Sequence, residues 1–142
     1  MDSGDIDTAV LDRLKNDATL AALMPDGVWF DMAPPGAKRF VLLTVFDTVD
    51  EDTFGGRAIE EVLYAVRAVG LASLSPNMKA AAQRIDELLA DPAPFAVPGF
   101  SFMASYRAEP GRIRLPPEVD KVDASIIWYH RGAHYRVEVA RQ

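Results

Sequence analysis

Apolar residues near the start of the chain recur at every fourth position, at Ile6, Val10, Leu14 and Ala18. This spacing is typical of a helix with one buried face. Asp5 is placed to cap the helix, because a short acidic side chain accepts hydrogen bonds from the free N–H groups of a first turn. Asp17 would break the segment and cap a second short helical turn, which Pro25 ends. The pattern predicts two short helical segments before the first strand.

The next part of the chain has the pattern of strands. Residues 40–48 are rich in β-branched and aromatic side chains and predict a strand, which follows a loop around Pro34-Pro35-Gly36. Residues 47–56 are polar and end in Gly55-Gly56, which indicates a hairpin connection or a longer exposed loop. Residues 57–69 fit both a strand and a helical stripe. The Gly-Gly turn before them favours the strand.

The clearest helix signal lies in the middle of the chain. Ser75 is followed by Pro76, a capping side chain and then a proline whose missing N–H has no cost in a first turn. An apolar stripe continues from there to Leu89, and Pro92 and Pro94 follow it. The sequence therefore predicts a helix over residues 75–89.

The last part of the chain alternates between apolar and polar residues. Residues 100–107 predict a half-buried strand. Residues 109–120 contain Pro110-Gly111 and two further prolines, which predicts a long connection. Two more alternating runs, 122–131 and 134–139, flank Gly132-Ala133. We interpret these two runs as a hairpin with a tight turn at the glycine.

These elements predict an α+β fold, an antiparallel or mixed β-sheet with helices packed on one face. The 142 residues are enough for one domain, which would span residues 1–142. Hydrophobic residues make up 49% and charged residues 25%, close to the average for a soluble domain. The chain has no cysteine, which excludes disulfides and thiolate metal sites.

The formal net charge of −6 argues against a dedicated nucleic-acid-binding protein. Such proteins gather Lys and Arg to neutralise phosphates, whereas an acidic surface repels DNA. The first residues are acidic where a signal peptide would be basic, and no stretch approaches the roughly 20 apolar residues of a membrane span. We expect a soluble, non-secreted protein.

The sequence offers little catalytic chemistry. His130 and His134 are the only histidines, and across the predicted hairpin they could share a metal ion, but no spacing supplies a third ligand. Ser101 and Ser105 lack the setting of a catalytic serine. The isolated glycines do not form a phosphate-binding loop. We expect a protein that is not an enzyme and has neither a metal nor a cofactor.

Two charged clusters are the candidate contacts with other molecules. Most of these residues would be solvated surface groups, and the alternative is a surface that meets a partner. The acidic cluster lies in the polar segment 47–56, and the basic cluster on the Pro-rich connection would form a docking arm for an acidic partner or a neighbouring subunit. The candidate contact residues are Asp50, Glu51, Asp52, Arg107, Arg112 and Arg114.

The order of features along the chain resembles the small tail-completion or tail-terminator proteins of long-tailed bacteriophages. The resemblance covers nearly the whole chain and rests on several features in order, with no single sharp motif. One departure is Arg39, at a position where family members often have proline. The segments that carry the resemblance are the Leu11-x-x-Leu14-x-x-Asp17-x-x-Leu20-x-x-Leu23 helix, Gly27-Val28-Trp29-Phe30-Asp31, the Ala33-Pro34-Pro35-Gly36-Ala37 loop, the strand from Phe40, the Ser75 to Leu89 helix, and Arg131-Gly132-x-x-Tyr135-Arg136-Val137.

The resemblance implies a structural virion protein. Such proteins form a homohexameric ring on the head-proximal end of the tail tube, stop tube growth, and meet the tail tube protein on one side and the head-neck or connector protein on the other. DNA would pass through the channel without specific binding, and no membrane would be involved. The expected location is the head–tail junction of the virion, after synthesis in the host cytoplasm.

Two alternatives stay open at this point. The first is a portal-side head-completion or neck adaptor, which would touch the connector instead of the tube. The second is a non-viral cytoplasmic module that binds a small ligand between helix and sheet, which a ligand would stabilise against heat.

Overall fold

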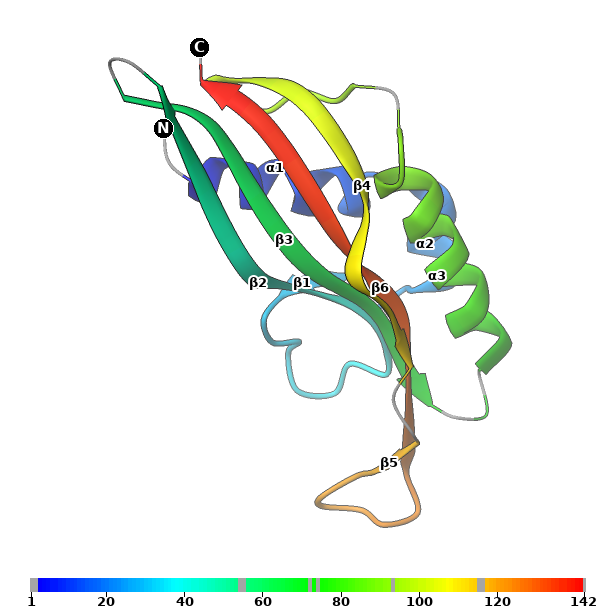
Figure 1. The fold of residues 1–142 in the computed structure, drawn as a ribbon. Helices are drawn as coiled ribbons and strands as arrows, with labels where there is room; N and C mark the ends of the chain where they lie inside the picture. Colours follow the sequence, from blue (N-terminus) through cyan, green and yellow to red (C-terminus); the bar gives the residue numbers. More distant parts are fainter. Residues whose placement is uncertain are drawn as a thin grey trace.

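A computed structural model describes residues 3–53, 56–71, 73, 75–92, 94–114 and 117–141. Three helices and six strands lie within these ranges, and the strands form one strongly twisted sheet (Figure 1). The helices are α1 (Ser3–Lys15), α2 (Ala18–Leu23) and α3 (Ser75–Leu89). The strands are β1 (Val28–Phe30), β2 (Arg39–Thr53), β3 (Gly56–Leu71), β4 (Phe100–Arg114), β5 (Glu118–Val119) and β6 (Ile127–Arg141).

The sheet is mixed. Its strand order is β1-β2-β3-β6-β4, and β5 pairs with the beginning of β6. Strand β1 runs parallel to β2, and the other pairings are antiparallel. The long strands β2 and β3 form a hairpin that extends away from the helices α2 and α3 (Figure 1). The predicted α+β class, with helices on one face of a mixed sheet, is confirmed.

The main core lies between the helices and one face of the sheet. Alternate residues of β3 and β6, such as Tyr64 and Tyr135, point to this face and are fully buried. Helix α3 adds Met78 and Ile85, and α1 adds Val10, all with no exposed surface. The apolar residues that recur at helical spacing in the sequence are therefore the ones that pack on the sheet.

Within the described residues, a second apolar cluster lies on the opposite face of the sheet, at one end. Phe40, Leu42 and Val69 form this small cluster. Ala33 and Ala37, from the loop before β2, pack on this cluster together with Trp128. Among the described residues farther along this face, Leu63 and His134 are buried, whereas Phe46 is 58% exposed.

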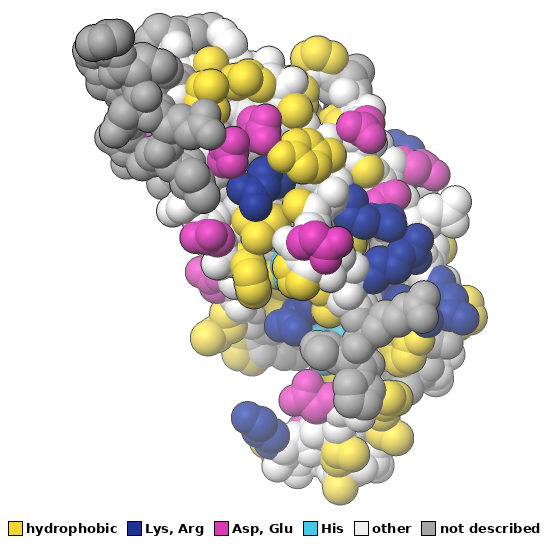
Figure 2. Space-filling model, viewed as in Figure 1, with side chains coloured by type: hydrophobic (Ala, Val, Ile, Leu, Met, Phe, Trp, Pro, Cys, Tyr) yellow, Lys and Arg dark blue, Asp and Glu magenta, His cyan; other side chains and the backbone are white. Residues whose placement is uncertain are grey.

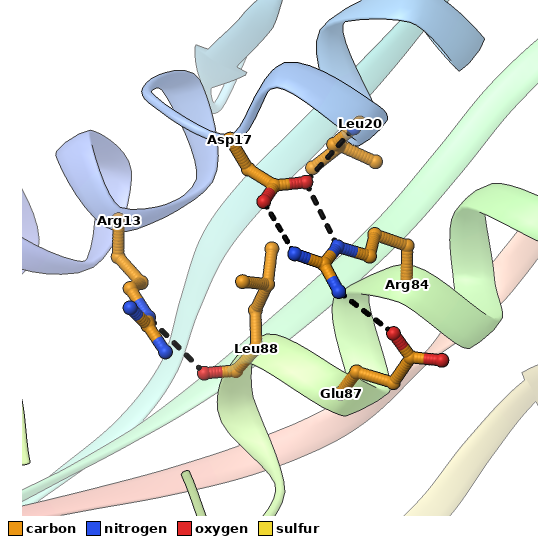
Figure 3. Close-up of polar contacts among 6 residues, drawn as sticks. All are labelled: Arg13, Asp17, Leu20, Arg84, Glu87 and Leu88. Atoms are coloured by element: carbon orange, nitrogen blue, oxygen red, sulfur yellow. Dashed lines mark hydrogen bonds and ion pairs between the residues drawn. The ribbon is translucent and has the colours of Figure 1, made fainter. Parts of the chain in front are cut away.

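Asp17 joins the first two helices to α3 (Figure 3). Its carboxylate accepts the N–H of Leu20 at 2.9 Å, which caps α2 as predicted. The same carboxylate receives two hydrogen bonds from the guanidinium of Arg84, at 2.6 and 2.9 Å. These bonds hold the pKa of Asp17 below its usual range. Arg13 adds a bond to the carbonyl of Leu88, so three polar side chains lock the helical layer together.

The polar segment 47–56 is not the loop that the sequence predicts. Strand β2 continues through it to Thr53, and β3 begins at Gly56, so the connection between the strands is very short. The segment pairs with β3, including Asp50 with Glu60, with one register shift between Glu51 and Asp52. The polar composition of this segment indicated a loop. Strands in an extended hairpin can be equally polar, because they need no apolar face where no helix covers them. Strand β3 confirms the strand interpretation of residues 57–69.

The predicted hairpin at Gly132 is also wrong. Strand β6 runs without interruption from Ile127 to Arg141, and Gly132 lies in its middle opposite Arg67 of β3. A Cβ atom on Gly132 would lie 1.9 Å from the carbonyl oxygen of Val66. This glycine therefore permits a close approach of two backbones, a role that glycine has in strand interiors as well as in turns.

The predicted connection 109–120 is in part a strand. Strand β4 continues to Arg114, across a bulge in which residues 108–111 lie opposite His134. Gly111 has a φ of +90°, which favours glycine, and its carbonyl oxygen accepts a 2.8 Å hydrogen bond from Nδ1 of His134. Pro110 and Gly111 predict the end of a strand, but in the structure they form a bulge within one.

Candidate interaction site

A cavity of about 300 Å³ opens between α3 and the strands β4 and β6. Its lining contains four basic side chains and one acidic side chain, and we call it the basic pocket. Lys and Arg side chains gather beside α3 in Figure 2, on an otherwise acidic chain. The charged lining residues are Lys79 and Asp86 from α3, Arg107 and Arg112 from β4, and Arg131 from β6.

Asp86 organises the inner part of the basic pocket. Arg107 donates two hydrogen bonds to one carboxylate oxygen of Asp86, at 2.5 and 3.1 Å. The hydroxyl of Tyr135 donates to the same oxygen at 2.8 Å. Burial and the bond to Asp86 raise the pKa of Tyr135 above its usual range. Arg107 thus has an ion-pair partner within its own chain, and its side chain remains one-third exposed.

Other basic side chains of the pocket have fewer partners within the chain. Lys79 and Arg112 are exposed, and within the described ranges neither forms an ion pair. Arg131 is half-buried and hydrogen-bonds to the hydroxyl of Tyr129 through two nitrogens, at 2.9 and 3.2 Å. Two exposed cationic groups, Lys79 and Arg112, are therefore available at the pocket, together with the half-buried Arg131.

The bulge in β4 explains why distant residues meet here. Arg107 and Arg112 are five positions apart, but they pair with Tyr135 and Ala133, which are two apart on β6. Because the bulge takes up the extra residues, both arginines reach the edge of the same cavity. The sequence identified Arg107 and Arg112 as a cluster but gave no sign that Lys79, Asp86 and Arg131 would join them.

The other candidate residues lie elsewhere or outside the described side chains. The three acidic candidates lie in β2, far along the hairpin, and only their backbone is described; they are Asp50, Glu51 and Asp52. Arg114 ends β4, and its side chain is likewise outside the description. Asp47, which is described, is exposed at the beginning of the acidic stretch. The structure does not bring the acidic and basic candidates together within one chain.

The two histidines lie on one face of β6, four residues apart, and do not share a site. Burial lowers the pKa of His130, whose Nε2 lies 3.3 Å from Glu118. His134 contacts the ring of Phe46, with 5.0 Å between the ring centres. In the part of the chain that the structure describes, no group of three or more His, Asp or Glu could hold a metal ion. None of the described helices is long and apolar enough to cross a membrane.

The fold is similar to that of solved structures. One is a chain of a native gene transfer agent virion, with 23% identity and a TM-score of 0.71 over 97% of this chain and 96% of that chain. A second solved protein has 16% identity and a TM-score of 0.58 over 100% of this chain and 96% of its own. At these identities the similarity shows a shared fold. No protein-family model matches the chain, and no curated protein matches it.

Proposed function

We propose that this chain is a structural virion protein of a phage-like particle. In this proposal it forms a ring on the head-proximal end of the tail tube, ends tube growth and joins the tail to the head-neck complex. The observation that carries the proposal is the fold shared along nearly the full length with a virion chain of a gene transfer agent. The specific place at the tail end rests on the resemblance of the sequence features to tail-completion proteins.

The open sides of the sheet support a role in assembly. Strand β1 covers only Val41 to Leu43 of β2, so the outer half of β2 has no described strand on its second side. Strand β4 lies at the opposite end of the strand order. Exposed strand edges are sites where further chains add, and proteins with long open edges usually cover them. Partners on both sides of each subunit are what a ring requires.

Disruption of the gene in a strain that produces the particle tests the proposal. The matched control restores the wild-type chain from a plasmid, and electron microscopy of the lysates shows heads and tails. We expect DNA-filled heads beside detached tails of uncontrolled length, and normal particles after restoration. Light scattering of the purified chain, alone and with polymerised tail tube protein, measures ring formation separately.

Two other results of the gene disruption would point to the alternatives. Detached tails of normal length would favour the neck adaptor, because an adaptor joins the tail without setting where the tube stops. Intact and infectious particles from the disrupted strain would refute the proposal and favour a binding module outside the virion.

A further inference from the structure

The chain carries groups of opposite charge on two separate elements. The first is the basic pocket, whose lining residues Lys79 and Arg112 are exposed. The second is the outer half of β2, which we call the acidic edge. It is an edge because β1 pairs with β2 only as far as Leu43. Its acidic residues, four within six positions, are Asp47, Asp50, Glu51 and Asp52.

These two surfaces cannot meet within one molecule. The acidic edge belongs to β2, on one side of the sheet, whereas the basic pocket lies beside β4, on the other side. The strands β3 and β6 separate them. Figure 1 shows the end of the β2–β3 hairpin and helix α3 at opposite ends of the molecule. Each surface is therefore placed to meet a different molecule.

We propose that the acidic edge of one copy docks against the basic pocket of the next copy. This inference rests on the ring proposed above and identifies the contact that builds it. A contact between two different surfaces of identical chains repeats from copy to copy, and it closes into a ring when the rotation between copies allows. Copies with a net charge of −6 repel each other overall, so a local attraction between opposite charges is what assembly needs.

The basic side chains of the pocket differ in whether they are already paired within the chain. Arg107 is held by Asp86, which also accepts a hydrogen bond from the hydroxyl of Tyr135, so its charge is already paired within the chain. Lys79 and Arg112 belong to different elements, α3 and β4, and both line the pocket and are exposed. These two side chains are the ones that receive the incoming carboxylates. Their substitution leaves the bonds of Asp86 intact.

Charge reversal on each surface tests the contact. The pocket variant is Lys79→Glu/Arg112→Glu, and the edge variant is Asp50→Lys/Glu51→Lys. A control with the same change in net charge as the pocket variant is Lys15→Glu/Lys121→Glu, because both lysines are exposed and lie outside the two surfaces. Sedimentation of the full chain measures assembly at low and high salt. Complementation of the disrupted strain measures assembly on particles.

We expect each reversed variant alone to associate about a hundredfold more weakly than wild type, because like charges then face each other. The control variant should assemble normally. A mixture of the pocket and edge variants should regain assembly, since every contact in an alternating ring again joins opposite charges. Assembly of the wild-type chain should weaken as salt rises.

The failures of the two proposals look different. Reversed variants that assemble and complement as well as wild type would overturn the docking contact and leave the ring standing. Variants that fail alone but are not rescued by mixing would also overturn it, and would favour an acidic virion partner in the pocket. A wild-type chain that stays monomeric alone and with tubes, and whose disruption leaves particles intact, would overturn the ring and the contact together.

Discussion

Replacement of Gly132 by alanine tests the central packing of the sheet. The new Cβ atom would lie 1.9 Å from the carbonyl oxygen of Val66 and 2.6 Å from the Cα atom of Arg67. Carbon atoms in favourable contact lie about 3.5–4.0 Å apart, so β3 and β6 must separate by more than 1 Å or twist locally. Both obstacles are backbone atoms and cannot rotate away. We expect a loss of about 3 kcal/mol in the free energy of unfolding, the upper range for overpacking.

A matched control lies in the neighbouring strand. A Cβ atom on Gly70 would lie 2.6 Å from the terminal carbon of Met78, the flexible end of a side chain that can move. We expect Gly70→Ala to cost about 1 kcal/mol. For a chain of this length, the losses correspond to decreases in Tm of roughly 10 °C and 3 °C. Circular dichroism of both variants at one protein concentration measures them.

A third variant separates the strand from the turn that the sequence suggested. Asparagine tolerates the left-handed backbone of a tight turn, so a turn glycine accepts Asn better than Ala. In the close strand contact, Gly132→Asn should be at least as damaging as Gly132→Ala. A Tm for Gly132→Ala within about 2 °C of wild type, which corresponds to less than about 1 kcal/mol, would refute the close approach. A Tm for Gly132→Asn clearly above that of Gly132→Ala would instead favour a tight turn at this position.

Three further predictions concern polar contacts that are partly or fully buried. Asp17→Asn keeps a capping side chain but loses the charge that binds Arg84, and should lower stability by about 1 kcal/mol at neutral pH. Because the pKa of Asp17 is lowered in the folded state, this contribution to stability is complete above pH 3.8 and disappears as the pH falls through the folded-state pKa. A Tm difference between Asp17→Asn and wild type that stays constant from pH 7 to about pH 2 would contradict this reasoning. Tyr64→Phe removes the 2.6 Å bond from a fully buried hydroxyl to Asp7 and should cost about 1–2 kcal/mol in urea unfolding. Ser105→Ala removes the 2.5 Å bond to the last carbonyl of α3 and should cost a similar amount, with unchanged stability as the contrary result.

The sequence by itself determined the helical layer and the fold class. The spacing of apolar residues selects one buried face of a helix, and a capping residue such as Asp17 or a first-turn proline such as Pro76 acts on its own first turn. These effects operate within a few residues, so they are readable without the rest of the chain. The same locality explains why residues 57–69 could be assigned to a strand from their composition and the glycines before them.

Only the tertiary structure decided what the glycines and prolines do. Gly132 could mark a turn or a close contact, and the choice depends on the backbone of β3, which lies 65 positions earlier at its partner Arg67. Pro110 and Gly111 could end a strand or form a bulge, and the pairing of β4 with β6 selects the bulge. Long-range strand pairing is set by which partners come together, and local preference does not encode it.

The candidate site has the same division. The sequence showed that positive charge gathers at residues 107–114 and negative charge at residues 47–52. It could not show that Lys79 and Arg131 complete a pocket with Arg112, because these residues come from three elements that meet only after folding. Nor could it place the two charged surfaces on opposite sides of one sheet. That separation follows from the strand order, in which two central strands lie between them.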